Sequence, residues 1–365
     1  MSQIRIGSVG IGSISRGVHL PGIDRSPDLR LTAVCDIDPE ALRYARETYG
    51  IDEAHCFTDY HDLINCPDVD AVDISTPNNV HFEVAMAAAQ AGKPYAVEKP
   101  ITLNSEQADA LAQVTREKNV KNMVCFSYRF KAAARYAKDL IQRGMLGTIY
   151  HVDMQYYQAW GLPFCQTPLV WRFQKDLTGS GALGDLGSHA LDLVRFVTGQ
   201  EYTRLVSHTG TFIQEREKLD GSGLGQVDVD DFSNYMAEMD GGIRATFRIT
   251  RFGYGRGNYQ TMEIYGSEGA IQYELDHVAP IPMKFPSASA RPTQRPMCSP
   301  SCPFLTSTRW IRCSLLPTSS TAKRTAWPPL FLTARSTSTP WTRCCSPAKK
   351  AAGSRCSDAN RPVIF

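Results

Sequence analysis

An acid and a histidine, Asp185 and His189, stand four residues apart in the segment GALGDLGSHALDLVRF, residues 181–196. Apolar residues recur through this segment at helical spacing, and positions four apart on a helix are neighbours. A carboxylate beside an imidazole suits the movement of a proton near neutral pH. An acid at the start of a helix beside a histidine satisfied by local contacts gives the same spacing, so the rest of the chain must decide.

A glycine-rich turn follows the first strand-like segment, IRIGSVGIGSIS. Gly10, Gly12 and Ser15 fit the pattern G-x-G-x-x-G/A, with serine as the small third residue. The first glycine permits a tight turn, and the second lets a pyrophosphate approach backbone N–H groups at the start of the next helix. Glycine-rich turns are common, so this motif predicts a dinucleotide site only in combination with its surroundings.

Those surroundings support a nucleotide site. Asp36 ends the next strand-like run 24 residues after Gly12, a spacing that suits a carboxylate bound to the ribose hydroxyls. Ile37 follows it, with no arginine there to meet a 2′-phosphate, which favours NAD over NADP. A turn residue before Asp38 and Pro39 is the alternative interpretation of Asp36.

Strands and helices then alternate, which predicts a parallel sheet. Segment 71–76 reads as a strand, segment 81–92 as a helix ending at Gly92, and segment 94–100 as another strand. Thr76, Pro77 and Asn78 follow the first of these strands, at the sheet edge where ligands bind. Glu98 and Lys99 follow the second, although a lysine at a strand end is usually only solvated.

The glycine turn, the strand-end aspartate, TPNNVH and EKP together resemble the glucose–fructose oxidoreductase/inositol dehydrogenase (Gfo/Idh/MocA) family over residues 4 to about 280. The resemblance implies an α/β fold with an N-terminal Rossmann parallel sheet and a C-terminal α/β domain whose open sheet is mostly antiparallel. It also implies that Lys99, Asp185 and His189 form the catalytic group. The segments YYQAW and WRFQKDLTGSGALGD are most similar to the inositol and levoglucosan dehydrogenase branch.

The side chains of this group suit the oxidation of a secondary alcohol. His189 would take the hydroxyl proton, for which its pKa should lie near the working pH, and Lys99 would stabilise the developing alkoxide. Asp185 would orient the hydroxyl and the imidazole, and Asp192, three residues after His189, would lie behind the residues that contact the substrate. Glycines Gly179, Gly181 and Gly184 would let a ligand approach the backbone.

We therefore expect an NAD-dependent dehydrogenase that transfers a hydride from a cyclic polyol or pyranose, with no metal. The expected cofactor-binding residues are Gly10, Gly12, Ser13, Ile14, Asp36, Ile37, Thr76, Pro77, Asn78, His81, Glu98 and Lys99. The expected substrate-binding residues are Tyr128, Arg129, Tyr157, Gln158, Trp171, Arg172 and Lys175. An NADPH-dependent sugar or ketose reductase and a non-catalytic NAD-sensing regulator are the alternatives, and the regulator would have no need of the three catalytic side chains.

The second domain contains a predicted helix at 132–147, a strand at 148–160 and two hairpins. The first hairpin turns at Asp240–Gly242 and the second at Gly266–Gly269. Sheets of this family often pack face to face between subunits, so we expect a homo-oligomer when the C-terminus is intact. The expected domains are 1–123 and 124–285, followed by an aberrant segment at 286–365.

That last segment differs in composition from the rest. It holds 12 of the 39 basic residues, one of the 37 acids and six of the eleven cysteines. A basic tail that binds nucleic acid is one interpretation. We favour a one-base shift of reading frame, which would leave these residues poorly ordered and expose an apolar patch where C-terminal helices belong. No nucleic-acid partner is then expected.

The genetic code allows this shift to be examined. In the shifted frame, each codon consists of the third base of one printed codon and the first two bases of the next. Because tryptophan has a single codon, TGG, three shifted codons have only one translation. They are aspartate at Trp310–Ile311, alanine at Trp327–Pro328 and aspartate at Trp341–Thr342. The codons of residues 308–330 can then encode AVDQMQSFADILNGKEDGLAAT, which is helix-like.

The chain of 365 residues has 42% hydrophobic and 21% charged residues, values typical of a globular protein. It has no apolar run of membrane-spanning length and no signal-peptide pattern, so we expect a cytoplasmic protein with reduced thiols and no membrane partner.

Overall fold

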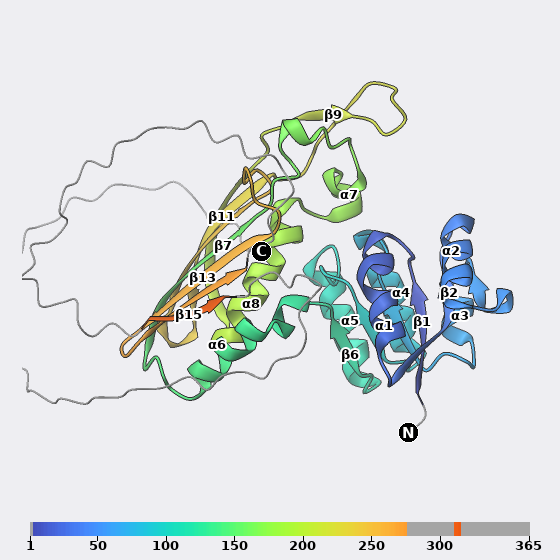
Figure 1. Ribbon diagram of the computed structural model, residues 1–365, viewed down its shortest axis with the longest axis horizontal. Helices are drawn as coiled ribbons and strands as arrows, with labels where there is room; N and C mark the ends of the chain where they lie inside the picture. The colour runs from blue at the N-terminus through green and yellow to red at the C-terminus, as the bar shows by residue number, and fades with distance from the viewer. Residues whose placement is uncertain (1–2, 276–309, 315–365) are drawn as a thin grey trace, which may run out of the picture. The chain divides into compact units, whose positions relative to one another are not determined.

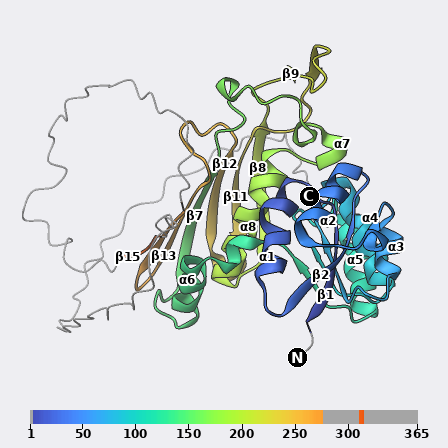
Figure 2. The ribbon, with the colours of Figure 1, turned by 45° about the vertical axis from the view of Figure 1, so that its right-hand side comes forward.

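The computed structural model describes residues 3–275 and 310–314 and contains two large sheets (Figures 1 and 2). Most of the aberrant segment predicted at 286–365 lies outside the described residues.

The N-terminal sheet has six parallel strands in the order β3-β2-β1-β4-β5-β6. Successive strands are added on one side of β1 up to β3 and on its other side from β4 onward. This strand order is that of a Rossmann fold, as predicted. Their bounds are β1 Ile4–Val9, β2 Leu29–Cys35, β3 Cys56–Phe57, β4 Ala71–Ile74, β5 Tyr95–Val97 and β6 Asn122–Val124.

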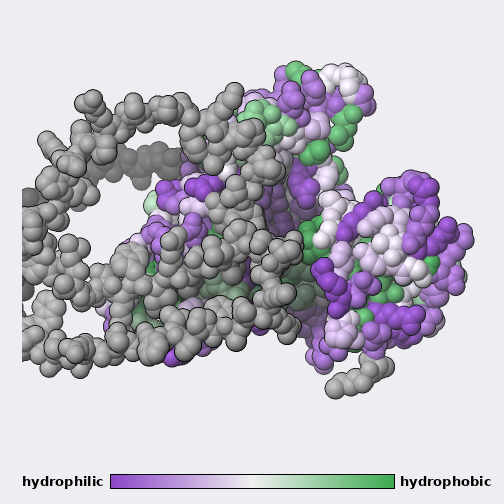
Figure 3. Space-filling view, viewed as in Figure 1, coloured by the Kyte–Doolittle hydropathy of each residue, from purple (hydrophilic) through white to green (hydrophobic). Residues whose placement is uncertain are grey.

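Helices connect these strands on both faces of the sheet. One face carries α1 Leu20–Arg25, preceded by a π-helical turn η1 Ser15–His19, and α2 Pro39–Tyr49. The other carries α3 Tyr60–Asn65, α4 Asn78–Gln90 and α5 Ser105–Glu117. The buried residues of α2 are small, and its polar residues face outward. The visible surface of the N-terminal domain is mainly hydrophilic (Figure 3).

The helix starts and ends follow local chemistry. Asp38 accepts a hydrogen bond from the N–H of Glu40 and caps α2, whose first residue is proline. Gly50 ends the same helix with φ of 68°. Gly92 follows α4 with φ of 71°, as the helix end predicted there requires.

The C-terminal sheet is mixed and mostly antiparallel, in the order β15-β14-β13-β7-β12-β11-β8. Within the described part of this sheet, only the pairs β7–β12 and β14–β15 are parallel. The strands are β7 Ile149–Tyr157, β8 Tyr202–Gly210, β11 Phe232–Met239, β12 Arg244–Thr250, β13 Tyr259–Gly266, β14 Ala270–Leu275 and β15 Trp310–Ser314. A small hairpin, β9 Glu215–Glu217 and β10 Leu224–Gln226, lies apart from this sheet.

Both predicted hairpins are present. β11 and β12 pair antiparallel around Asp240–Gly242, and β13 and β14 pair around the turn between Gly266 and Ala270. Helices α6 Ala132–Gln142 and α8 Ser188–Thr198 lie along one face of the sheet and enclose its core (Figures 1 and 2). Alternate residues of β12, beginning with Ala245, Phe247 and Ile249, point into that core.

Strand β15 comes from the segment for which we expected little regular structure. It pairs in parallel with β14 through five residues. An edge strand offers a row of unpaired backbone groups that accepts a neighbour of almost any sequence, because main-chain hydrogen bonds form the ladder.

Candidate active site

The glycine turn follows β1 and has the geometry that a bound dinucleotide requires. Gly10 has φ of 89°, and a Cβ there would lie 2.7 Å from the backbone nitrogen of Thr76. At Gly12 a Cβ would meet no atom within 4 Å, so a ligand has room beside the backbone. Ser15 is fully buried against the sheet, which explains the small third residue. The turn therefore fits a pyrophosphate.

Asp36 lies at the carboxyl end of β2, beside this turn. Its carboxylate accepts hydrogen bonds from the backbone N–H groups of Ile11, at 2.6 Å, and Asp38, at 2.9 Å. Each carboxylate oxygen retains a further lone pair for a ribose hydroxyl. The side chain of Ile37, an expected cofactor residue, is 88% exposed.

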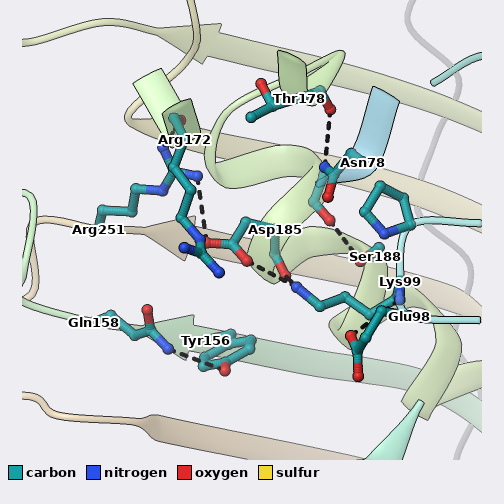
Figure 4. Close-up of polar contacts among 12 residues, drawn as sticks. Asn78, Glu98, Lys99, Tyr156, Gln158, Arg172, Thr178, Asp185, Ser188 and Arg251 are labelled. Carbon is teal, nitrogen blue, oxygen red and sulfur yellow. Dashed lines mark hydrogen bonds and ion pairs between the residues drawn. The ribbon is translucent and has the colours of Figure 1, made fainter. Parts of the chain in front are cut away.

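A cavity opens along the ends of β1, β4 and β5 and reaches the second domain. Nine of the twelve expected cofactor residues line it: Gly12, Ser13, Ile14, Thr76, Pro77, Asn78, His81, Glu98 and Lys99. Residues of the second domain close the other side, among them Trp171, Arg172 and Asp185. The side chain of Asn78 donates a hydrogen bond of 3.1 Å to the carbonyl of Thr178 and so links the domains at this cavity (Figure 4).

His81 supports this cavity from beneath. It is 1% exposed, and its two ring nitrogens lie 2.7 Å from the carbonyl oxygen of Pro100 and 2.9 Å from that of Thr76. Burial lowers its pKa, despite both contacts. A neutral imidazole donates from one nitrogen only, so His81 hydrogen-bonds one of these two carbonyl oxygens at a time and has no free donor for the cofactor.

Lys99 and Asp185 meet at the boundary between the two domains (Figure 4). The Lys99 ammonium lies 2.8 Å from a carboxylate oxygen of Asp185 and 3.3 Å from its backbone carbonyl. Arg251 reaches the other carboxylate oxygen at 3.3 Å. Burial alone would raise the pKa of Asp185, but Lys99, Arg251 and Arg172 outweigh it and hold this pKa well below its usual range. Asp185 is therefore a carboxylate at any working pH.

Arg251 is a site residue that our interpretation of the sequence missed. Its side chain is 1% exposed and lies over the ring of Trp160, 4.6 Å from the centroid. The alternation Ala245, Phe247, Ile249 along β12 continues inward to position 251, so an arginine at a core position was a detectable signal. A buried guanidinium needs a carboxylate partner, and Asp185 supplies it.

Asp185 and His189 do not pair with each other. The turn that holds Asp185, η6 Leu183–Gly187, is π-helical, and α8 begins only at Ser188. The wider π turn changes the i,i+4 relationship that the sequence predicted. The carboxylate bonds Lys99 and Arg251, whereas Nδ1 of His189 is buried with no hydrogen-bond partner among the described residues.

His189 lies among aromatic rings. Its ring centroid is 4.7 Å from that of Tyr128 and 5.8 Å from that of Phe126. Burial, and then the charge of Lys99, lower its pKa to about 3, although Asp185 acts in the opposite direction. The expectation of a pKa near the working pH is therefore not met. His189 is neutral at pH 7 and retains a lone pair that can accept a proton.

Gly181 is a glycine for a reason other than the close approach of a ligand that the sequence predicted. A Cβ on Gly181 would lie 1.9 Å from the carbonyl oxygen of Asp230, so the backbone of Asp230 occupies that space. The Asp230 carboxylate accepts hydrogen bonds of 2.7 Å from the N–H groups of Gly181 and Leu183. Gly181 thus fixes the π turn, and with it Asp185, rather than admitting a ligand.

A second cavity adjoins the first at Asp185. It has a volume of about 390 Å³, within the range of small-molecule sites. Its lining residues are Gln158, Trp160, Thr167, Val170, Arg172 and Asp185. Gln158 and Arg172 were expected substrate residues, and Trp171 lines the first cavity. Indole, amide and guanidinium groups around one carboxylate suit a ligand with several hydroxyls.

A hydrogen-bond network supports this second cavity. Gln158 donates to Asn258 at 3.0 Å and accepts from the indole N–H of Trp160 at 2.6 Å. Asn258 bonds the hydroxyls of Tyr128 and Tyr156, which lie 2.7 Å apart. Tyr128 therefore fixes the network and the ring of His189, and Asn258 is a second residue that the sequence analysis missed.

Four expected residues lie elsewhere. Arg129 forms an ion pair with Asp192, so Asp192 supports Arg129 and not His189. The next position after buried Tyr156, Tyr157, points to the other face of the sheet and packs on Tyr259. Lys175 is exposed and begins the short helix α7 Lys175–Thr178. Strand alternation explains the position of Tyr157, and the ion pair explains those of Arg129 and Asp192.

Comparison with known proteins agrees with this arrangement. Residues 4–126 match the profile of the oxidoreductase family with an NAD-binding Rossmann fold, and residues 134–272 match the GFO/IDH/MocA C-terminal domain. The chain is 35% identical over 269 residues to levoglucosan dehydrogenase of Pseudarthrobacter phenanthrenivorans, covering 70% of this chain and 68% of that protein. The chain belongs to the Gfo/Idh/MocA family.

Other members of the Gfo/Idh/MocA family are similar as well. Myo-inositol 2-dehydrogenase of Thermotoga maritima is 26% identical over 73% of this chain and 74% of that protein. A solved levoglucosan dehydrogenase in complex with NADH has a TM-score of 0.69 at 34% identity, covering 75% of this chain and 73% of that one. An oxidoreductase domain protein from Kribbella flavida has a TM-score of 0.71 at 34% identity, covering 75% and 74%.

The protein is thus an NAD-binding oxidoreductase, as predicted. Among the described residues, no helix combines the length and apolar character needed to cross a membrane.

Proposed function

We propose that the protein oxidises a secondary alcohol of a cyclic polyol or pyranose, with Lys99, Asp185 and His189 as its catalytic residues. The observation that carries the proposal is the ion pair between Lys99 and Asp185 at the point where the two cavities meet. One residue comes from each domain. A sugar in the second cavity would therefore present its hydroxyl to charges from both.

The residues divide the chemistry between them. The Lys99 ammonium stabilises negative charge on the reacting oxygen, while the Asp185 carboxylate accepts a hydrogen bond from a hydroxyl and fixes its direction. The neutral imidazole of His189 accepts the proton. Its low pKa makes proton transfer less favourable in the free protein, and the network through Tyr128 holds the ring in place. NAD, when bound, takes the hydride.

Arg172 and Arg251 adjust the same carboxylate. Both lower the pKa of Asp185, so the acid stays charged even beside a ligand that excludes water. Asp36 at the ribose end favours NAD, because a 2′-phosphate there would lie against its negative charge. A regulator without catalysis is the less favoured alternative, because binding NAD alone does not require the Lys99–Asp185 ion pair.

The first experiment is a thermal melt with and without NADH, followed by NAD⁺ reduction at 340 nm on levoglucosan, myo-inositol and simple pyranoses. Binding of NADH to the folded chain raises Tm. We expect turnover on at least one cyclic substrate. Lys99→Met should lower kcat by about 10²–10⁴-fold, the scale of one preorganised charge with its proton-transfer partner.

Lys175→Met is the matched control, because this lysine is exposed and lines neither cavity. It should leave kcat within about twofold, as expected of a surface change. Unchanged turnover in Lys99→Met would contradict the catalytic assignment. NADH binding without turnover on any cyclic alcohol would contradict the substrate class. Oligomer formation and a cytoplasmic location stay predictions, the former open to light scattering.

A further inference from the structure

Three side chains of the kinds that bind transition metals meet in the Rossmann domain, away from the cofactor. One donor atom from each of His55, Cys66 and Asp68 lies within 4.8 Å of the other two. His55 ends the short turn Glu53–His55 before β3, while Cys66 and Asp68 lie in the loop between α3 and β4. All three therefore lie at the amino ends of strands, whereas the cofactor cavity opens at the carboxyl ends.

The donors and their spacing suit a zinc ion. Thiolate, imidazole and carboxylate are the three kinds of side chain that bind Zn²⁺, and around a tetrahedral ion the donor atoms lie about 3.3–3.6 Å apart. Nε2 of His55 is 3.2 Å from a carboxylate oxygen of Asp68. The Asp68 side chain is 52% exposed, so it has room to turn toward the sulfur of Cys66.

The backbone already holds the three residues in place. The carbonyl of Cys66 accepts a hydrogen bond of 2.8 Å from the ammonium of Lys93. The carbonyl of Asp68 accepts one of 2.7 Å from the hydroxyl of Thr32. The N–H of His55 is bonded within its own turn. A ligand that binds here has little chain to order, which favours its affinity.

The three side chains differ in burial in a way that a metal site requires. Cys66 is 8% exposed and has no disulfide partner, so its sulfur is shielded from water. His55 and Asp68 line a cavity of about 260 Å³ beside it. This volume holds an ion together with a water molecule as its fourth ligand.

The charges of the site balance with a divalent ion. A thiolate and a carboxylate together neutralise it, and the imidazole binds as the neutral ring. Two arginines border the same cavity. Arg5 donates hydrogen bonds of 2.8 Å to Asp68 and to Asp70, so its charge is already compensated. Arg30 is exposed, and solvent and salt screen its charge.

Another group of this composition among the described residues is less suitable. His19, Glu98 and Cys125 also place their donor atoms within 4.8 Å of one another. However, the His19 ring has a carboxylate at each nitrogen, Asp73 at 2.8 Å and Glu98 at 3.1 Å. Both nitrogens then carry protons, and neither offers a lone pair to a metal. His55 has such a carboxylate partner at Nε2 alone.

We propose that His55, Cys66 and Asp68 form a binding site for a divalent transition-metal ion, which the donor set identifies as Zn²⁺. Binding releases the thiol proton and requires the imidazole proton on Nδ1, which the partly exposed ring can donate to water. The bound ion ties the turn before β3 to the loop before β4 and stabilises the Rossmann domain.

This proposal departs from the expectation of no metal, because the spacing of the three residues follows no common zinc motif. With three protein ligands the site keeps an open position, so a chelator should remove the ion. The proposal does not depend on the substrate or on the catalytic residues.

The test uses the full chain, reduced and freed of metal with EDTA, and titrates it with Co²⁺ and then with Zn²⁺. We expect a thiolate-to-cobalt charge-transfer band and the visible bands of tetrahedral Co²⁺, both of which Zn²⁺ removes. Zn²⁺ should also raise Tm as its free concentration rises. NADH affinity should be the same with and without Zn²⁺, since the site lies away from the cofactor cavity.

Cys66→Ser should abolish the charge-transfer band and lower Zn²⁺ affinity by more than about 100-fold, beyond the effect of a change outside the ligands. His55→Gln, at a partly exposed position, should also lower the affinity and leave Tm of the metal-free chain unchanged. Cys56→Ser is the matched control, because the Cys56 sulfur points to the carbonyl of Asp52 at 3.5 Å. It should keep the band and the affinity of the parent chain.

Four outcomes would overturn the proposal. They are the absence of a charge-transfer band in the parent chain, a band that survives Cys66→Ser, equal loss of affinity in Cys66→Ser and Cys56→Ser, and unchanged affinity in His55→Gln. A band that only Cys125→Ser removes would place the metal at His19 and Glu98 instead. These measurements need no turnover, so they remain informative even if no substrate is found.

Discussion

Two histidines with little solvent exposure, His19 in the Rossmann domain and His189 in the second domain, have opposite electrostatics. The His19 ring lies 2.8 Å from Asp73 and 3.1 Å from Glu98. Burial lowers its pKa, but the two carboxylates more than reverse this and raise it to about 10. His189 has aromatic neighbours and the Lys99 charge, and its pKa falls to about 3.

The difference shows that burial alone does not fix the protonation state of a histidine. The nearby charges decide whether its pKa is raised or lowered. The His19 cation joins the carboxyl ends of β4 and β5, because Asp73 is the penultimate residue of β4 and Glu98 follows β5. Glu98 also accepts a hydrogen bond from the backbone N–H of Lys99. Nδ1 of His189 has no hydrogen-bond partner among the described residues, so no polar contact of this atom holds the fold.

Substitution by phenylalanine at positions 189 and 19 should separate a role in catalysis from a role in folding. The largest effect should be the loss of kcat at position 189. His189→Phe should lower kcat by about 10²–10⁴-fold, because it removes the proton acceptor. The aromatic neighbours accept another ring, so folding and NADH affinity should change little. Steady-state kinetics and NADH titration measure both. Wild-type kcat in this variant would remove His189 from the mechanism.

His19→Phe should instead affect folding. It leaves the Asp73 and Glu98 carboxylates buried without their cation, a change that destabilises proteins by about 3–5 kcal/mol. Urea unfolding measures the loss. His208→Phe, at an exposed histidine on β8, is the control and should change stability by less than about 0.5 kcal/mol. Equal effects at positions 19 and 208 would show that the ion pairs contribute nothing.

The pH dependence of stability should distinguish the two histidines as well. The His19 pKa is higher in the folded protein than its ordinary value of 6.5. Its contribution is therefore complete below about pH 6.5 and is lost as pH rises toward 10, by roughly 1 kcal/mol per pH unit. Cys125 is the other titratable group of this cluster, and burial raises the pKa of its thiol.

Unfolding measured from pH 6 to 10 tests this dependence, with His19→Gln as the variant that cannot titrate. The slope should be present in the parent chain and absent in His19→Gln. A parallel slope in both would assign it to other groups.

The smallest expected effect concerns the imidazole of His189, whose protonation state should not change between pH 5 and 8. His189 should stay neutral from pH 5 to 8, since its pKa lies near 3. NMR of the imidazole resonances, assigned by comparison with His189→Phe, should show no shift for His189 over this range. A midpoint near 6.5 for His189 would show that its surroundings are open to water.

Much of the nucleotide side could be predicted because its signals are local. A turn that needs φ of 89° at Gly10 needs glycine, and Asp36 ends a strand whose neighbours fix its position. The Lys99–Asp185 pair came from the family resemblance, since 86 positions separate the two residues.

The residues that the sequence analysis missed depend on contacts between distant segments. Arg251 is 66 positions from Asp185, and Asn258 is 130 positions from Tyr128. His19 is 54 positions from Asp73 and 79 from Glu98. Strand alternation separates neighbouring residues in the same way, because Tyr157 points to the opposite face of the strand from Tyr156.

The sequence by itself determined the parallel sheet, the glycine turn and the strand ends that hold Thr76 and Glu98, because backbone preference and hydrophobic alternation act over a few residues. Only the tertiary structure decided which charges meet. It paired Asp185 with Lys99 and Arg251 instead of His189, and it gave His19 two carboxylates and His189 none. The physical reason is that a pKa depends on charges within a few ångströms, and the fold alone sets those distances.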